Sequence, residues 1–386
     1  MERSDRRPLE IVGEDTNASE ITAVFDSLGA SATLALDTES DSFHRYREKV
    51  CLIQISTEDR DILFDPLAHG LPDALRGLMT DEGRTWLLHG GDFDVLSLRR
   101  DFDVVLGRVF DTGLAARFLG RKAIGLASML DSELGIHIGK GEQRSDWARR
   151  PLSPKQIDYA RQDTAHLHAL AGCVREELSR LGRLAWVEEE CELLRHRVPN
   201  PRVFDPDGWL SIKGVKTLSP PGRRAARAAY LWREARAKKL DRAQFRVLGN
   251  EAIKGLGSAV DRDGLRALQD PRSVKGMPRR GPPPGLMKAV RDGVQAKAPV
   301  PDRKPRKPKD GREGPPADKE RVGRLRALRT QLSESTGLEP GLLLPNALCE
   351  KLVLASPKST EALAAVPGMT RWRVEVAGES LLVNVT

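Results

Sequence analysis

The sequence contains few residues that would indicate a membrane, secreted or zinc-binding protein. Its 386 residues include four cysteines, at positions 51, 173, 191 and 349, and no two of them form a Cys-x-x-Cys pair. This spacing argues against both a zinc site and a disulfide framework. There is no run of about 18 apolar residues, and the first ten residues, MERSDRRPLE, lack the apolar core of a signal peptide. We therefore expect a cytoplasmic protein with no membrane partner.

Charge is distributed unevenly along the chain. Residues 1–195 contain 25 Lys and Arg against 35 Asp and Glu, whereas residues 196–386 contain 38 against 20, so a half of net charge −10 precedes a half of +18. A strongly basic segment attracts polyanions through counterion release, and an acidic segment repels them unless cations intervene. The asymmetry favours a nucleic acid partner, bound mainly by the second half.

Apolar runs in the first half predict a sheet. The segments 33–36, 50–56 and 61–64, joined by short polar turns, indicate an antiparallel meander. Residues 85–88 and 109–110 predict two further strands, and helices are expected over 21–28, 71–79, 92–100, 112–119, 124–134 and 154–180. The length of the chain also predicts two or three domains.

Acidic residues follow or interrupt these elements at positions that could form a metal site. Asp37 and Glu39 are two residues apart at the end of a strand, so both side chains point to the same side of it. Asp94 lies in the first turn of the 92–100 helix, and Tyr159 and Asp163 are one helical turn apart. Taken alone, Asp94 is explained by the helix dipole and the Tyr159–Asp163 pair by surface packing.

Together these residues have the composition of a phosphodiesterase site. Carboxylate oxygens are the ligands that Mg²⁺ or Mn²⁺ prefer, and two such ions about 4 Å apart can clamp both oxygens of an in-line displacement at phosphorus. Tyr159 is a poor base, because a free tyrosine has a pKa near 10, but its hydroxyl can orient a water molecule. His166 and His168 are two residues apart on the same helix and are interpreted as ordinary histidines.

Four segments of the first half resemble the exonuclease motifs of the ribonuclease D family, the branch of the DEDD superfamily with tyrosine in its third motif. They are LDTESDSFHRYREKVCLIQIS, LLHGGDFDVL, FDTGLAARFLG and LSPKQIDYARQD. The resemblance covers about residues 10–195 and implies an RNase H-like α/β fold, a mixed sheet flanked by helices. It also implies 3′–5′ hydrolysis of RNA to nucleoside monophosphates, with transfer RNA precursors as the substrate that the family suggests and no small-molecule cofactor.

The resemblance also assigns roles to the candidate residues. Asp37 would bridge two ions, Glu39 and Asp163 would complete the tighter site, and Asp94 would hold the second ion largely through water. Tyr159 would position the attacking water. Lys140 falls where related enzymes place a lysine near the terminal phosphate. Trp147, in the pattern SDW, is interpreted first as a structural anchor and second as a stacking surface.

The second half resembles two helicase-and-RNase-D C-terminal (HRDC) domains, which are small helical bundles. The expected organisation is an exonuclease domain over 1–195, an HRDC-like domain over 196–296, a linker rich in Pro, Lys and Arg over 297–318, and a second HRDC-like domain over 319–386. The first copy departs from the HRDC pattern at residues 276–281, GMPRRG, where an apolar turn is usual.

Two alternative functions remain open at this stage. A 3′–5′ exonuclease acting on DNA would use the same five residues, and sequence motifs do not identify the group that recognises the 2′-hydroxyl. A nucleic-acid-binding protein with an inert catalytic domain is the other alternative. The complete set of four acids and a tyrosine argues against it.

Overall fold

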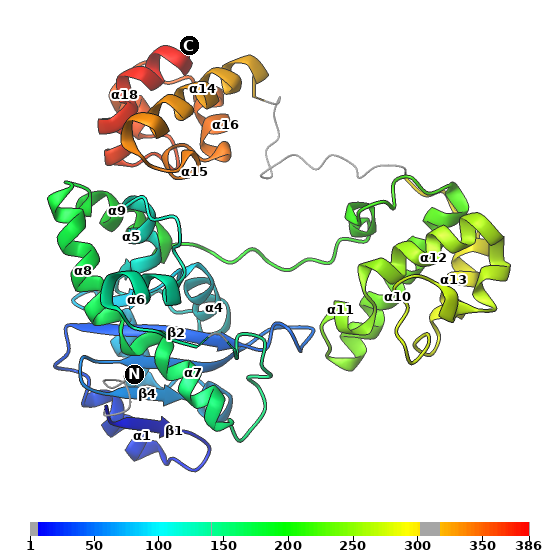
Figure 1. Ribbon diagram of the computed structural model, residues 1–386, viewed down its shortest axis with the longest axis horizontal. Coiled ribbons are helices and arrows are strands. Elements are labelled where there is room, and N and C mark those ends of the chain that lie inside the picture. Colours follow the sequence, from blue (N-terminus) through cyan, green and yellow to red (C-terminus); the bar gives the residue numbers. More distant parts are fainter. Residues whose placement is uncertain (1–6, 140, 302–316, 386) are drawn as a thin grey trace. The chain divides into compact units, whose positions relative to one another are not determined.

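A six-stranded mixed sheet forms the centre of the N-terminal domain (Figure 1). The computed structural model describes residues 7–139, 141–301 and 317–385. The strands of the sheet are β1 (Leu9–Val12), β2 (Thr33–Ser40), β3 (Val50–Ser56), β4 (Asp61–Phe64), β5 (Thr85–Leu88) and β6 (Arg108–Asp111). The expected strands and their flanking helices are present, which confirms the predicted fold class.

The strand order is β1-β4-β3-β2-β5-β6. β2, β3 and β4 form the predicted antiparallel meander, and β5 and β6 extend it in parallel beyond β2. β1 was not predicted, because Leu9–Val12 lies in a polar context; it pairs with β4 in parallel at the opposite edge. This order places β2, the strand with Asp37 and Glu39, in the interior of the sheet.

Nine helices of this domain are described. They are α1 (Ala18–Asp26), α2 (Pro66–His69), α3 (Asp73–Thr80), α4 (Asp92–Phe102), α5 (Thr112–Phe118), α6 (Leu126–Leu134), α7 (Pro154–Ala165), α8 (Leu167–Arg180) and α9 (Leu184–Arg195). The single helix expected over 154–180 is wrong, because His166 leaves the helical conformation with φ −112° and ψ 2°. The break separates α7, which packs on β2, β3 and β4, from α8, which packs mainly on α5 and α6.

The chain divides into two compact units. The first unit contains the described residues up to Ser40, from Val50 to Pro199, and from 317 to 385. The second unit contains Asp41–Lys49 and residues 200–301. In the second unit, the Phe43 ring of the β2–β3 loop lies 6.3 Å from that of Phe245. The core of this unit is built mainly by α10 (Pro220–Leu240), α12 (Asn250–Asp263) and α13 (Leu286–Gln295).

The regular elements described in the second unit are all helices. Its helices are the 3-10 turns η2 (Gly208–Ser211), η3 (Gly264–Leu268) and η4 (Pro271–Ser273), with α10 (Pro220–Leu240), α11 (Gln244–Val247), α12 (Asn250–Asp263) and α13 (Leu286–Gln295). Buried alanines at 225, 226 and 229 line one face of α10, so α12 and α13 can pack closely against it.

The C-terminal bundle is all helical, as the resemblance to an HRDC domain implies, and five helices of it are described. They are α14 (Lys319–Thr336), α15 (Pro340–Leu343), α16 (Asn346–Ala355), α17 (Thr360–Ala364) and α18 (Arg371–Val385). Among the residues in the described ranges, no helix is long and apolar enough to cross a bilayer. Most of the linker expected over 297–318 lies outside the described residues.

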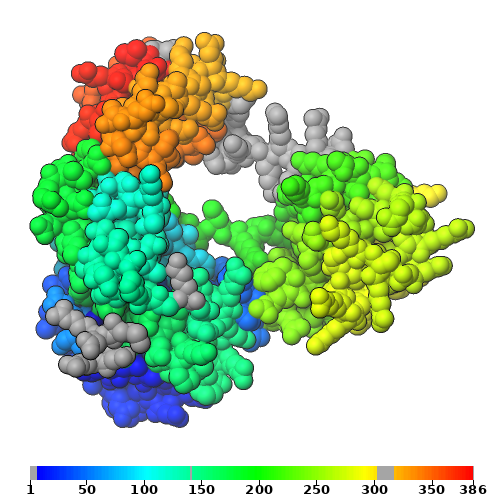
Figure 2. Space-filling view, viewed as in Figure 1, coloured from blue at the N-terminus to red at the C-terminus, as the bar shows by residue number. Residues whose placement is uncertain are grey.

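The C-terminal bundle packs directly on the N-terminal domain, and in Figure 2 its orange residues lie against the green and cyan ones. Trp372 of α18 is 1% exposed, stacks on Trp186 of α9 with ring centroids 5.4 Å apart, and meets Phe118 edge to face at 5.2 Å. Its indole N–H donates to Glu190 at 3.0 Å, and Arg373 pairs with the same carboxylate. An aromatic cluster and a shared, nearly buried acid therefore join the two parts.

We expect Trp372→Ala to lower the free energy of unfolding by about 3–5 kcal/mol, because the substitution removes a buried ring and leaves a cavity. Chemical denaturation of the full chain measures the change. Val383→Ala, on the same helix at a residue that is 75% exposed, is the control and should change stability by less than about 0.5 kcal/mol. Equal effects of the two substitutions would contradict the described packing.

Candidate metal centre

Strand pairing fixes the first two acids of the site. In the β2–β3 ladder, Asp37 faces Gln54 and Glu39 faces Leu52. All seven residues of β3 are buried, so β2 is held against an apolar strand along its length. Because side chains alternate along a strand, Asp37 and Glu39 point to the same side of β2.

The third acid comes from α7. Ser153 and Gln156 form a capping box at the start of this helix, and Pro154 occupies its first position, which explains why it begins there. Thr164, next to Asp163, is buried and its hydroxyl lies 2.7 Å from that of Ser56 on β3. This contact anchors the last turn of α7 on the sheet.

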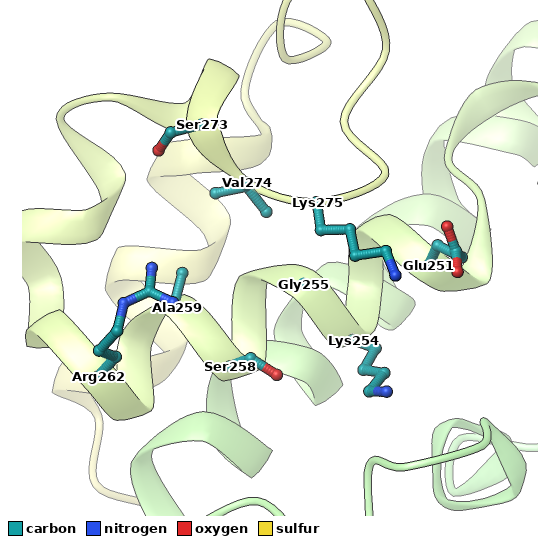
Figure 3. Close-up of a pocket in the computed structure, with 9 residues that line it drawn as sticks. All are labelled: Glu251, Lys254, Gly255, Ser258, Ala259, Arg262, Ser273, Val274 and Lys275. Atoms are coloured by element: carbon teal, nitrogen blue, oxygen red, sulfur yellow. The ribbon is translucent and has the colours of Figure 1, made fainter.

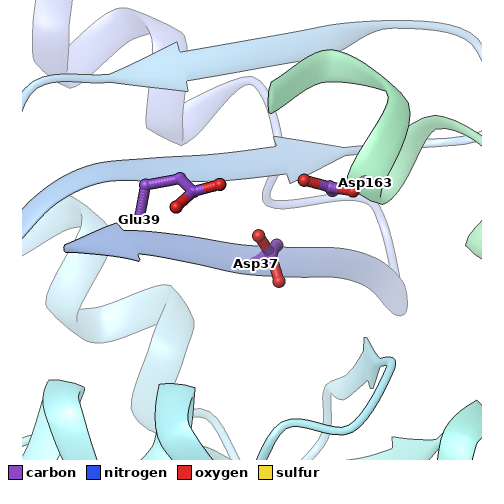
Figure 4. Close-up of side chains that lie close together, drawn as sticks. All are labelled: Asp37, Glu39 and Asp163. Atoms are coloured by element: carbon purple, nitrogen blue, oxygen red, sulfur yellow. The ribbon is translucent and has the colours of Figure 1, made fainter. Parts of the chain in front are cut away.

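The three carboxylates converge (Figure 4). One oxygen each from Asp37, Glu39 and Asp163 lies within 4.8 Å of the other two. Side chains from a strand and from a helix more than 120 residues later therefore form one acidic cluster, as the sequence predicts. The hard oxygen donors fit a divalent cation such as Mg²⁺ or Mn²⁺.

Asp94 lies beside this cluster and not within the tight group. It is 6% exposed in the first turn of α4, and one of its oxygens accepts hydrogen bonds from the backbone N–H of Thr38 at 3.0 Å and from its hydroxyl at 2.5 Å. Since Thr38 stands between Asp37 and Glu39, these bonds tie Asp94 to the acidic strand. Its charge acts on all three acids of the cluster.

Burial and mutual repulsion raise the pKa values of these acids. Burial, followed by repulsion from neighbouring carboxylates, raises the pKa of Asp37 well above its usual range and that of Glu39 to about 9. Burial also raises the pKa of Asp163 to about 7, and that of Asp94 to about 6 although hydrogen bonds from Thr38 oppose the shift. The cluster therefore requires protons or a bound cation to compensate its charge.

Tyr159 lies beside Asp163 on α7. Burial and the negative charges of the cluster, Asp163 first among them, raise the pKa of its hydroxyl, and the Gln143 side chain lowers it. The net shift of the pKa is upward, so the hydroxyl keeps its proton. The Trp147 ring lies 6.1 Å from the Tyr159 ring and is fully buried, which agrees with an anchoring role and leaves it no exposed face for stacking.

The remaining predicted positions lie elsewhere. Lys140 is outside the described residues. The Nε2 atom of His168 lies 3.1 Å from the carbonyl oxygen of Ser56, and His166 ends α7; neither belongs to the acidic cluster.

Sequence reasoning assigned no role to Asp111, although it lies in the FDTGLAARFLG segment. Asp111 ends β6 beside Leu88, the last residue of β5. Its carboxylate accepts hydrogen bonds from the backbone N–H groups of Gly90 at 3.0 Å, Gly91 at 2.6 Å and Leu114 at 2.8 Å. One buried acid therefore caps α5 and holds the glycine turn that leads into α4 and Asp94. The available signal was an acid at a strand end directly before a helix.

Comparisons with known proteins agree with this architecture. A family model described as 3′–5′ exonuclease matches residues 14–179, and a model described as HRDC domain matches residues 318–385. One HRDC domain is thus shown, and it is the C-terminal one.

Relatives match over nearly the whole chain. Ribonuclease D of Xanthomonas oryzae is 29% identical over 343 residues, which are 88% of this chain and 90% of the relative, and that of Gluconacetobacter diazotrophicus is 28% identical over 372 residues, 95% and 91%. The crystal structure of Escherichia coli RNase D matches the fold with a TM-score of 0.63 at 22% identity, covering 98% of each chain. The chain is therefore similar to ribonuclease D over nearly its whole length, and the matches support a 3′–5′ exoribonuclease with an N-terminal exonuclease domain and a C-terminal HRDC domain.

Proposed function

We propose that this enzyme trims the 3′ ends of structured RNA, with transfer RNA precursors as substrates, by a reaction that depends on two divalent ions. The convergence of the Asp37, Glu39 and Asp163 oxygens within 4.8 Å of one another carries the proposal. A structured substrate is supported by the E. coli relative, which is described as an exoribonuclease involved in structured RNA processing.

The metal ions would be held by four acids. Asp37 would contribute to both sites, Glu39 and Asp163 would complete one, and Asp94, which lies beside the tight group, would serve the other. When bound, Mg²⁺ or Mn²⁺ supplies positive charge to the attacking and leaving oxygens of the phosphodiester. An anionic substrate could not otherwise approach a cluster of carboxylates.

The protein's own groups position the reactants. The Tyr159 hydroxyl, which stays protonated, lies one helical turn from Asp163, and in the complex it would orient the attacking water. Thr38 holds Asp94 through two hydrogen bonds. Such positioning lowers the barrier because the groups do not reorganise during the reaction.

The domains divide the work. We assign residues 1–195 to catalysis, 196–296 to a first HRDC-like domain and 319–386 to a second, with 297–318 as the linker. The basic half attracts RNA, and the acidic half accepts a 3′ end only when its cations are in place. Lys140 would contact the terminal phosphate.

The first experiment compares three substrates of one sequence: a transfer RNA with a 3′ extension, a plain RNA strand and a DNA strand. We expect single nucleotides to leave the 3′ end of both RNAs in Mg²⁺ or Mn²⁺, with none released in excess chelator. Asp94→Asn, the matched control, should lower turnover by several orders of magnitude and leave RNA affinity nearly unchanged. Cleavage in chelator, or faster loss from DNA than from RNA, would contradict the proposal.

Metal binding should also change the pH dependence of stability. Without metal, the raised pKa values of Asp163 (about 7) and Glu39 (about 9) mean that the folded protein binds more protons than the unfolded one. Their stabilising contribution is present below about pH 4 and is lost as the pH rises through the folded-state values. Since a divalent ion replaces these protons, we expect the increase in Tm caused by Mn²⁺ to be larger at pH 8 than at pH 6. A scanning thermal assay with Asp37→Asn as control tests this; an equal increase at both pH values would refute it.

Asp111 should act as a positioning residue for Asp94. We expect Asp111→Ala to lower kcat by at least about tenfold and to raise the Mg²⁺ concentration for half-maximal rate, with RNA affinity unchanged, because the turn before α4 loses two hydrogen bonds. Asn17→Ala removes the cap of α1 and is the stability-matched control, at a cost of about 1 kcal/mol. If both variants lose the same Tm and the same kcat, the role of Asp111 is only structural.

A further inference from the structure

The second unit has an open groove along α12. It is lined by one face of that helix, at residues Glu251, Lys254, Gly255, Ser258, Ala259 and Arg262, and by the segment Ser273–Lys275, and it encloses about 280 Å³ (Figure 3). Three small residues, Gly255, Ser258 and Ala259, lie along its helical side, between the longer charged side chains.

Close backbone packing shapes this groove. A Cβ at Gly255 would lie 2.2 Å from the carbonyl oxygen of Lys275, so the 273–275 segment can approach α12 only because residue 255 is glycine. Gly276 follows with φ +81°, and a Cβ there would lie 2.7 Å from the backbone nitrogen of Ala252. Both glycines therefore hold the segment, and with it Lys275, against the helix.

The groove is positively charged and open to solvent. Lys254, Arg262 and Lys275 are exposed, and Figure 3 shows Lys275 and Arg262 near opposite ends of the groove. In the part of the chain that the structure describes, neither lysine makes an ion pair, whereas Arg262 pairs with the exposed Asp263 at 2.9 Å. Glu251 is the one acid among the lining residues, so cations outnumber it.

The wall of the groove continues into the segment that departs from the HRDC pattern. Residues 271–280 contain Arg272, Lys275, Arg279 and Arg280 and no acid. An apolar turn at this place would close a bundle, but these residues leave a basic surface. The departure thus adds charge next to an already basic groove.

We infer that this groove binds the phosphate backbone of the substrate RNA. The inference rests on the proposed function and names a contact surface for it. Cations along an open groove suit a phosphodiester chain, and the hydroxyls of Ser258 and Ser273 can donate to phosphate oxygens. No aromatic side chain lines the groove, so it offers no stacking for bases and predicts binding that is independent of sequence.

The test compares two triple variants of the full chain. Lys254→Gln/Arg262→Gln/Lys275→Gln removes the groove cations, and Lys239→Gln/Lys288→Gln/Arg291→Gln removes three exposed cations of the same unit away from the groove. Affinity for a fluorescent RNA longer than 20 nucleotides is measured in chelator over a range of salt concentrations. We expect the groove variant to flatten the slope of log K against log salt by about 2 and to weaken binding at least about tenfold at 0.1 M salt, and the control variant to change little.

A charge-neutral variant separates the groove from the general field of the domain. Ser258→Leu fills part of the groove without altering charge, so we expect it to weaken RNA binding several-fold. Unchanged binding by Ser258→Leu, or equal losses in the two triple variants, would overturn the inference. Loss of RNA binding in millimolar inorganic phosphate at constant ionic strength would also overturn the inference. The groove would then be a site for the free ion.

Hydrolysis of a trinucleotide, too short to reach a second site, reports on the catalytic centre alone. We expect the wild-type chain, the two triple variants and Ser258→Leu to hydrolyse it at the same rate. If the wild-type chain failed to hydrolyse it in Mg²⁺ or Mn²⁺, the proposed function would be wrong; normal hydrolysis with unchanged RNA affinity in the groove variants would refute the groove alone.

Discussion

Repulsion among partly buried carboxylates is the constraint on which the structure of the site depends. Asp37, Glu39 and Asp163 approach within 4.8 Å, and burial raises their pKa values further. Left to themselves, such groups would separate or keep their protons. The sheet prevents the first, because β2 is paired on both sides and α7 is fastened to β3 through Thr164 and Ser56. The fold thus holds together a cluster of negative charge that protons or a bound cation must compensate.

The part of this arrangement that follows from local chemistry could be predicted from the sequence. The two-residue spacing of Asp37 and Glu39 fixes their common side of a strand, and the four-residue spacing of Tyr159 and Asp163 fixes their common face of a helix. The meander was likewise predicted, because apolar runs joined by short polar turns are local signals. That these segments meet was predicted by resemblance and not by periodicity.

What the sequence did not predict depends on tertiary contacts. β1 is a strand because β4 offers it a free edge, and a polar segment gives no sign of that. The helix expected over 154–180 breaks at His166, where the chain passes from α7, packed on β2, β3 and β4, to α8, packed mainly on α5 and α6. Trp372 could have belonged to the core of its own bundle, yet it stacks on Trp186 of α9. Asp111 was overlooked for the same reason, since its partners Gly90 and Gly91 follow a neighbouring strand.

The separation of acids from bases along the chain has a physical reason. A lysine close to the acidic cluster would pair with its carboxylates, satisfy them at short range and compete with the metal ions. Most of the cations that attract RNA therefore belong to the second half of the chain. Affinity for RNA then depends on salt, while affinity for metal depends on the carboxylates, and each can change without the other.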